Sequence, residues 1–116
     1  MQDRQNRNKY GNARTEIDGI VFASMREARR YCELKMLQKA GLIHGLELQK
    51  VYTLIGPQKD KDGKIIKHPV KYIADFVYRE KDGTLVVEDA KGMKTDVYKI
   101  KRKLMLSIYG IRVKEV

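Results

Sequence analysis

The sequence predicts one α/β domain whose elements run in the order helix, strand, strand, strand, helix, strand. Two segments carry apolar residues at helical spacing between cap residues. The stretch between them is rich in β-branched and aromatic residues and contains Asp-Gly turns, which is typical of strands. A length of 116 residues supports one modest core and is too short for two. We therefore expect a flexible basic arm, residues 1–15, and one domain, residues 16–116.

Composition indicates a polyanionic partner. The net charge of +10 favours nucleic acid before an anionic membrane surface. A membrane-surface helix needs bulky aromatic residues, and the chain has no Trp and only two Phe. No run of about 18 apolar residues is present to span a membrane, and the first residues lack the apolar segment of a secretory signal. Cys32 is the only cysteine, which excludes an internal disulfide and fits a reducing cytoplasm.

The arm is polar and basic, without a hydrophobic period. It is either a solvated tail or a segment that binds phosphate. Its candidate phosphate contacts are Arg7, Lys9 and Arg14. After the arm, Asp18-Gly19 is a hairpin-turn dipeptide followed by three apolar residues, so a short turn or strand should lead into the first helix.

The first helix is predicted over residues 24–40. Ser24 is a good N-cap, Glu27 lies at capping-box spacing, and Gly41 supplies a C-terminal stop. The apolar side chains fall on one broad face suited to packing on a sheet; they are Met25, Ala28, Tyr31, Cys32, Leu34, Met36 and Leu37. Arg26, Arg29 and Arg30 should then point toward solvent or a ligand.

Three strands are predicted next. Residues 46–55 mix alternation with β-branched residues and end at Gly56-Pro57, which indicates a strand or a bent pair. Residues 56–69 are polar and are expected to form a loop. Strands 70–79 and 84–91 follow, joined through Asp82-Gly83 as a hairpin.

The second helix is predicted over residues 95–109, between an N-cap at Thr95 and a stop at Gly110. Its expected core face is the helically spaced set Val97, Ile100, Leu104 and Ile108. Basic residues at this helix and the first one are predicted to bind DNA phosphates, although a solvated face is the alternative; they are Arg26, Arg30, Lys94, Lys99, Lys101 and Lys103. Lys101 and Lys103 cannot both face one site. Residues 111–116 alternate as a final strand.

Acidic residues interrupt the predicted hairpin. Because Asp is disfavoured in strands and costly to bury unpaired, Asp75 and Asp89 suggest that a cation lies between them. Alternation puts Asp89 and Lys91 on one face and Glu88 on the other. With Asp75 alongside, two carboxylates and the Ala90 carbonyl would supply oxygen ligands that Mg²⁺ accepts together with waters. A lysine beside a metal-bound water can orient it or stabilise its deprotonated form.

Asp75 followed by Asp89-Ala90-Lys91 resembles the PD-(D/E)XK nuclease superfamily, and the order of elements agrees with it. Over nearly the whole chain, further segments resemble a small phage-encoded family of that superfamily; they are Lys9 to Asn12, Asp18 to Ser24, Glu27-Ala28, Gln49, Ala74 to Phe76 and Glu88 to Gly92. The resemblance implies a restriction-endonuclease-like core, a mixed sheet flanked by two helices, with metal-binding acids on the second and third strands. It also implies a third acid, Glu27, from the first helix. Ala74 stands where Pro is common in the superfamily.

The acids also have structural interpretations. Glu27 is the capping-box acid, and the two roles can coexist. Asp75 can pair with Lys71 or Lys91 in an ion pair. A β-bulge would present Glu88 in place of Asp89.

Two further residue types are less decisive. Gln49 can orient water or metal ligands, or it can be an ordinary polar edge residue. Gln49 and Glu88 are therefore candidates for the shell around the metal ligands. His44 and His68 lack metal-ligand spacing and are expected on the surface.

The resemblance and the residues together predict a Mg²⁺-dependent endodeoxyribonuclease, with Mn²⁺ as a substitute ion. Asp75, Asp89 and Glu27 would bind the metal, and Lys91 would position the attacking water. Branched or junction DNA is a candidate substrate, and cutting both strands would need a homodimer because the chain carries one site. We expect a phage-encoded protein in the bacterial cytoplasm. The alternatives are a non-catalytic DNA-binding module and an RNA-cleaving enzyme.

Overall fold

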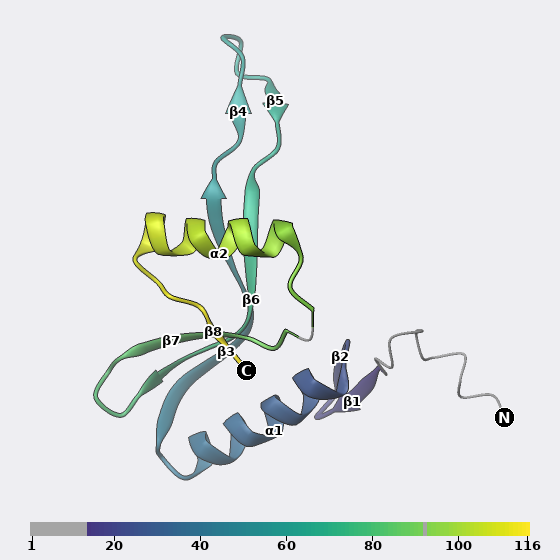
Figure 1. Ribbon diagram of the computed structural model, residues 1–116, viewed down its shortest axis with the longest axis vertical. Coiled ribbons are helices and arrows are strands. Elements are labelled where there is room, and N and C mark those ends of the chain that lie inside the picture. The colour runs from purple at the N-terminus through teal and green to yellow at the C-terminus, as the bar shows by residue number, and fades with distance from the viewer. Residues whose placement is uncertain (1–13, 92) are drawn as a thin grey trace, which may run out of the picture.

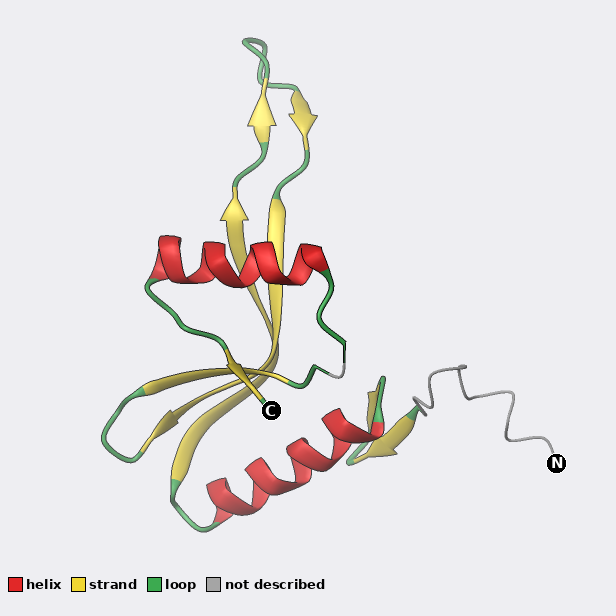
Figure 2. Ribbon diagram, viewed as in Figure 1, coloured by secondary structure: helices red, strands yellow, loops and turns green. Residues whose placement is uncertain are grey.

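The computed structural model describes residues 14–91 and 93–116, so Arg7 and Lys9 lie outside the described residues. Its centre is a four-stranded sheet in the order β3-β6-β7-β8. The long strands β3 (Ile43–Ile55), β6 (Val70–Glu80) and β7 (Leu85–Asp89) are antiparallel neighbours. Strand β8 (Lys114–Glu115) runs parallel to β7, which makes the sheet mixed. The predicted mixed α/β class and order of main elements are thus confirmed (Figures 1 and 2).

Helix α1 (Met25–Lys39) covers one face of the sheet at the end where β3 begins (Figure 1). The Glu27 N–H donates to Ser24 Oγ at 3.1 Å, which confirms the predicted N-cap. Only Ala28, Tyr31 and Leu34 are fully buried. The expected broad apolar face is too wide, since Met36 is 72% exposed. Cys32 and Leu37 are partly buried against the same cluster, so the predicted face is too wide only at Met25 and Met36.

A short hairpin precedes α1, formed by β1 (Thr15–Ile17) and β2 (Ile20–Phe22). Its turn is the Asp18-Gly19 dipeptide, and both residues have positive φ, which matches the turn predicted from the sequence. Phe22 is buried against Tyr31 of α1, with ring centroids 5.1 Å apart. The hairpin therefore closes the N-terminal side of the α1 cluster.

Helix α2 (Asp96–Tyr109) packs on the opposite face of the sheet, further along β3 and β6. The predicted caps are present, with Thr95 Oγ1 accepting from the Tyr98 N–H and Gly110 in the left-handed region. The predicted core face is right only at Leu104, which packs against the core, whereas Val97, Ile100 and Ile108 are 62%, 58% and 47% exposed. Tyr98 and Met105, two turns apart, are buried instead. The helix is rotated by about one residue, because the Tyr98 ring packs in the core while its hydroxyl reaches Glu115 at 2.8 Å.

Strands β3 and β6 change faces at a shared break. Leu46 and Leu48 of β3 pack in the α1 cluster, whereas Tyr52 and Leu54 pack in the α2 cluster. All four are even-numbered and would share a face in a regular strand. The switch falls at Gln49, a non-glycine residue with φ of 54°. On β6, the α2 cluster holds residues 72 and 74 and the α1 cluster holds 76 and 78, so the partner break falls at residue 75.

The polar segment 56–69 contains a second hairpin, so the expected loop is wrong. Strands β4 (Gln58–Lys59) and β5 (Ile65–Lys67) pair and form a ribbon that projects beyond the sheet (Figure 2). Asp60 Oδ1 accepts the backbone N–H groups of Asp62 and Lys64, which organises the tip. The final predicted strand is shorter than expected, with only Lys114–Glu115 paired to β7. Neither helix of the described chain has the length and apolar composition of a membrane span.

A buried ion pair joins α1 to β7. Glu88 is fully buried, and Arg30 donates to both its carboxylate oxygens, at 2.8 and 2.6 Å. The Tyr78 hydroxyl donates to the same carboxylate, and Glu33 pairs with Arg30 at 3.0 Å. Glu88 therefore faces α1 and not the predicted metal site. Arg30, predicted to contact DNA, has its guanidinium engaged within the fold.

Replacing Arg30 should leave a buried carboxylate without its cation. We expect Arg30→Ala to lower the free energy of unfolding by about 3 kcal/mol, measured by chemical denaturation. Arg29→Ala, on the same helix but at an exposed position, is the control and should change it by about 0.5 kcal/mol or less. Equal effects of the two substitutions would contradict a structural role for the Arg30–Glu88 pair.

Candidate active site

The antiparallel pairing of β6 with β7 brings Asp75 to Asp89, since Phe76, the residue after Asp75, lies opposite Glu88. Asp75 Oδ2 accepts the Ala90 N–H at 2.8 Å, which ties the carboxylate to the end of β7. Asp89, the last residue of β7, is 2% exposed, and its Oδ2 accepts the Tyr72 hydroxyl at 2.6 Å. The two carboxyl groups are close enough for the charge of Asp89 to raise the pKa of Asp75. The structure therefore brings the two predicted metal acids together.

The second oxygen of Asp89 has no hydrogen bond. Oδ1 is buried, and no hydrogen-bond partner for it is present in the described part of the chain. Its nearest cation is Lys91 Nζ at 3.6 Å. Lys91 also lies over the ring of Tyr98, with Nζ 5.0 Å from the centroid, so its ammonium is held beside the carboxylate. A buried carboxylate oxygen without a donor is costly, which indicates a site that accepts a further cation or donor.

Glu27 joins this group from the first turn of α1. Its backbone N–H caps the helix through Ser24, while its carboxylate accepts from Gln49 Nε2 at 3.3 Å. The same Gln49 nitrogen donates to Asp75 Oδ1 at 3.3 Å, so one amide links the two acids. Glu27 therefore takes part in the N-cap through its backbone and lies beside the other acids through its side chain. Gln49 holds this position in a left-handed backbone conformation that glutamine rarely adopts.

The acids of this cluster raise one another's pKa. The pKa of Asp75 is raised to about 7, chiefly by burial and further by the charges of Asp89 and Glu27, while the Ala90 N–H opposes the shift. Burial is also the largest cause of the raised pKa of Glu27, followed by Asp89, and Lys91 lowers it. The cluster therefore holds more negative charge than Lys91 alone compensates.

The donor set fits a magnesium ion held partly by water. Within residues 14–91 and 93–116, no three Asp, Glu, His or Cys side chains are arranged as a ready-made metal site. Asp75 and Asp89 nevertheless provide carboxylate oxygens, and Asp89 Oδ1 is without a donor. Mg²⁺ is commonly bound through one or two carboxylates, with waters completing its shell. Asp75 and Asp89 could supply the two carboxylates, and Glu27 lies beside Asp75 because the Gln49 amide bonds both. The Ala90 carbonyl stays a predicted ligand.

The predicted basic residues separate into distinct surroundings. Lys101 lines a cavity of about 280 Å³ together with Asp89 and Lys91, whereas Lys103 lines a different one beside Arg112. Only Lys101 of this pair therefore faces the carboxylates. Lys99 and Arg14 are exposed. Lys94 pairs with Glu115 at 3.1 Å and also contributes to the low pKa of Glu115, which the Tyr98 hydroxyl chiefly lowers to about 2.

Two contributors were missed from the sequence. Tyr72 donates to Asp89, and Lys71 lines the cavity beside Asp89 and Lys91. In a regular strand, Tyr72 and Asp75 would lie on opposite faces. Because β6 changes faces between Ala74 and Phe76, Tyr72 can lie on the α2 side and still reach Asp89, the neighbour of Asp75. The sequence contains no recognised feature that predicts this change of face, so neither Tyr72 nor Lys71 could be assigned to the site. The two histidines are exposed, as expected, although His44 lies within β3.

Comparison with known proteins gives one family. A family model described as "Protein of unknown function (DUF1064)" matches residues 7–114. No curated protein and no solved structure matches the chain.

The raised pKa of Asp75 predicts that this residue destabilises the fold at high pH. Between pH 4 and 7 the folded chain retains a proton on Asp75 that the unfolded chain has released, so the free energy of unfolding falls as pH rises. In EDTA at pH 8, we expect Asp75→Asn to be more stable than the parent by about 2 kcal/mol. The difference should shrink toward pH 4.

Asp62→Asn, at an exposed position on the ribbon, is the control and should follow the parent at every pH. Thermal or urea unfolding across this pH range measures both variants. A parent chain that remains the more stable one at pH 8 would contradict the account of repelling carboxylates.

Proposed function

The chain belongs to the DUF1064 family of proteins of unknown function, and we propose that it is a Mg²⁺-dependent endodeoxyribonuclease with a restriction-endonuclease-like core. The observation that carries the proposal is the convergence of Asp75, Asp89, Glu27 and Lys91 from α1, the middle of β6 and the end of β7. The sheet order, with a parallel final strand and a helix on each face, agrees with the same superfamily.

The proposed chemistry is hydrolysis of a phosphodiester. Lys91 Nζ would hold the attacking water by hydrogen bonds and stabilise its deprotonated form, since its ammonium is kept beside Asp89 and over Tyr98. Asp75, Asp89 and the Ala90 carbonyl would hold the Mg²⁺ ion, and Glu27 would complete the acidic surroundings. When bound, the ion supplies a Lewis acid that offsets the charge developing on the phosphate. Mn²⁺ is expected to substitute for it.

An unbalanced cluster of acids favours an enzyme over a non-catalytic DNA-binding module. A module that used only the basic surface would gain stability by losing Asp75, because burial and like charges raise its pKa to about 7. It would also gain by giving the buried Asp89 Oδ1 a donor. Asp75 and Asp89 lower the stability of the fold although the chain has a net charge of +10. Such acids are typical of a site that needs them to bind a ligand.

DNA is the proposed substrate, with RNA as the second candidate. Both present phosphates to the same residues, and the preference for DNA follows the superfamily resemblance. Branched or junction DNA, a phage-encoded origin and a location in the bacterial cytoplasm belong to the same proposal.

Purified protein should nick supercoiled DNA in Mg²⁺ and not in EDTA. We expect Asp75→Ala, Asp89→Ala and Lys91→Ala each to lower the cleavage rate by about 100-fold or more, because each removes a group that acts on the reacting phosphate or water. Glu27→Gln keeps the backbone cap and should lower the rate as well. Lys35→Ala, exposed on α1, is the control and should retain the parent rate.

Cleavage products from plasmid, four-way junction and RNA substrates identify the preferred substrate. Cleavage that continues in EDTA, or that survives Asp75→Ala and Lys91→Ala, would contradict the enzyme. Preferential cleavage of RNA would favour the second candidate.

A homodimer is proposed to cut both strands, and the exposed stripe of α2 is the surface available for it. Val97, Ile100 and Ile108 share this stripe and are all exposed. We expect the parent chain to sediment as a dimer and Ile100→Lys to sediment as a folded monomer whose melting temperature no longer depends on protein concentration. Ile66→Lys, at an equally exposed position on the ribbon, should remain dimeric. A monomeric parent chain would rule the dimer out.

A further inference from the structure

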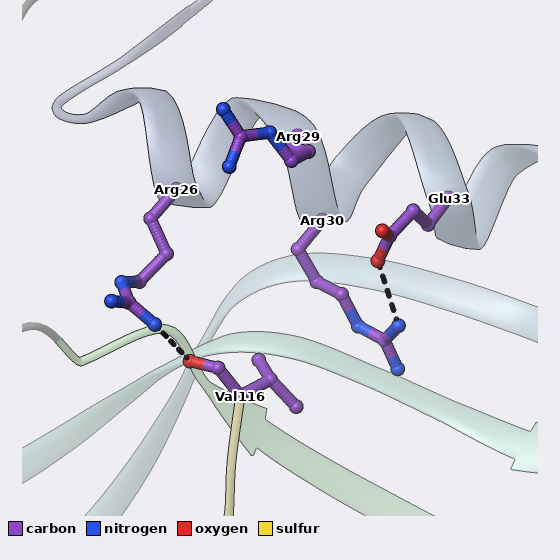
Figure 3. A pocket seen from close by; sticks show the side chains of 5 residues that line it. All are labelled: Arg26, Arg29, Arg30, Glu33 and Val116. Atoms are coloured by element: carbon purple, nitrogen blue, oxygen red, sulfur yellow. Dashed lines mark hydrogen bonds and ion pairs between the residues drawn. The ribbon is translucent and has the colours of Figure 1, made fainter.

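Two basic pockets flank the carboxylates, one beside α1 and one beside α2. The α1 pocket is lined by Arg26, Arg29, Arg30, Glu33 and Val116 and has a volume of about 280 Å³ (Figure 3). The α2 pocket has the same volume and lies between β6 and the first turns of α2. Its charged lining residues are Lys71, Asp89, Lys91 and Lys101. Each pocket therefore gathers cations close to the proposed reaction centre.

The α1 pocket retains two arginine charges. Arg30 is neutralised by Glu88 and Glu33. Among the described residues, Arg26 donates to a main-chain oxygen of Val116, the last residue of the sequence, at 3.3 Å, as Figure 3 shows. Arg29 has no acidic partner within the described part of the chain. Two guanidinium groups at i and i+3 on one helix thus have no Asp or Glu partner in the described chain, and guanidinium suits phosphate in geometry as well as charge.

The α2 pocket retains two lysine charges. Lys91 lies beside Asp89, but neither Lys71 nor Lys101 has an acidic partner among the residues that the structure describes. Thr95, the N-cap of α2, lines the same cavity, so the positive end of the helix dipole adds to the two ammonium groups. The pocket is therefore suited to a second anion.

The carboxylates lie between the two pockets. Arg26 precedes Glu27 on α1, and the Val116 that it contacts donates its N–H to the Asp89 carbonyl at 3.1 Å. The Asp89 side chain in turn lines the α2 pocket. Asp89 is therefore linked to both pockets, and a polyanion that occupies both would pass close to it.

We propose that the two pockets bind the phosphates on either side of the phosphate that is hydrolysed, so that the substrate is an internal stretch of a DNA strand. The identity of the central phosphate rests on the proposed function. Binding by Arg26 and Arg29 on one side and by Lys71 and Lys101 on the other does not require cleavage. A terminal phosphodiester, which lacks a neighbour on one side, should be hydrolysed more slowly than an internal one.

Binding of a short fluorescein-labelled DNA duplex in EDTA tests the pockets without cleavage. Arg26→Gln/Arg29→Gln and Lys71→Gln/Lys101→Gln should each weaken binding by about tenfold and reduce the slope of log K against log salt by about 1. Lys35→Gln/Lys39→Gln removes the same charge from exposed positions further along α1 and should change affinity by about twofold or less. The charge-conserving pair Lys71→Arg/Lys101→Arg should retain binding, which separates lost charge from misfolding.

The outcomes distinguish this inference from the proposed function. Three neutralised variants that bind alike, or a weakening in only one pocket variant, would overturn two-sided binding. If the protein does not cleave DNA in Mg²⁺ but both pocket variants still bind DNA more weakly, the nuclease proposal is wrong and the two-pocket binding proposal is supported. In an active enzyme, a neutral methylphosphonate on either side of the cut should slow the parent, and each pocket variant should lose that sensitivity on one side only.

Discussion

The site depends on the break that β3 and β6 share at Gln49 and Asp75. On one side of the break, even-numbered side chains of both strands pack under α1, namely 46 and 48 of β3 and 76 and 78 of β6. On the other side they pack under α2, namely 52 and 54 of β3 and 72 and 74 of β6. The helices lie on opposite faces of the sheet, and the first turn of each approaches the site: Glu27 of α1 contacts Gln49, and Thr95 before α2 lines a cavity with Asp89. The residues at the break are released from both cores. They project where Glu27 and the end of β7 can reach them.

The backbone of Gln49 is strained in this arrangement. A left-handed backbone at a glutamine is strained, by about 1 kcal/mol, and a strand residue in that conformation interrupts the ladder. Its amide then bridges Glu27 and Asp75, which keeps two acids together that would otherwise repel. Strain, a raised pKa at Asp75 and a carboxylate oxygen of Asp89 without a donor all occur within one cluster. The buried Glu88 next in sequence has none of these features, since Arg30 and Tyr78 satisfy it from the other face.

Much of the fold was predictable because it rests on local chemistry. The caps at Ser24, Thr95 and Gly110 placed both helices to within a residue or two, and the Asp-Gly turns placed two hairpins. Alternation separated Asp89 from Glu88 correctly, because β7 is regular up to its last residue. The face of α2 was not predictable from apolar spacing. Tyr98 is amphipathic, and its choice of face depends on Glu115, which arrives from a distant strand.

The site was only partly predictable, for a related reason. Asp75, Asp89, Lys91 and Glu27 were identified by residue type and by resemblance, but nothing local to β6 predicted the break that orients Asp75. Tyr72 and Lys71 could therefore not be assigned to the site, and Arg30 was mistaken for a surface cation because its partner is far away in sequence. Mn²⁺ titration followed by electron paramagnetic resonance tests the central claim most directly. We expect the parent chain to reduce the signal of free Mn²⁺ and Asp89→Asn to leave it unchanged; equal binding by the two, or no binding by either, would contradict a metal site at Asp89.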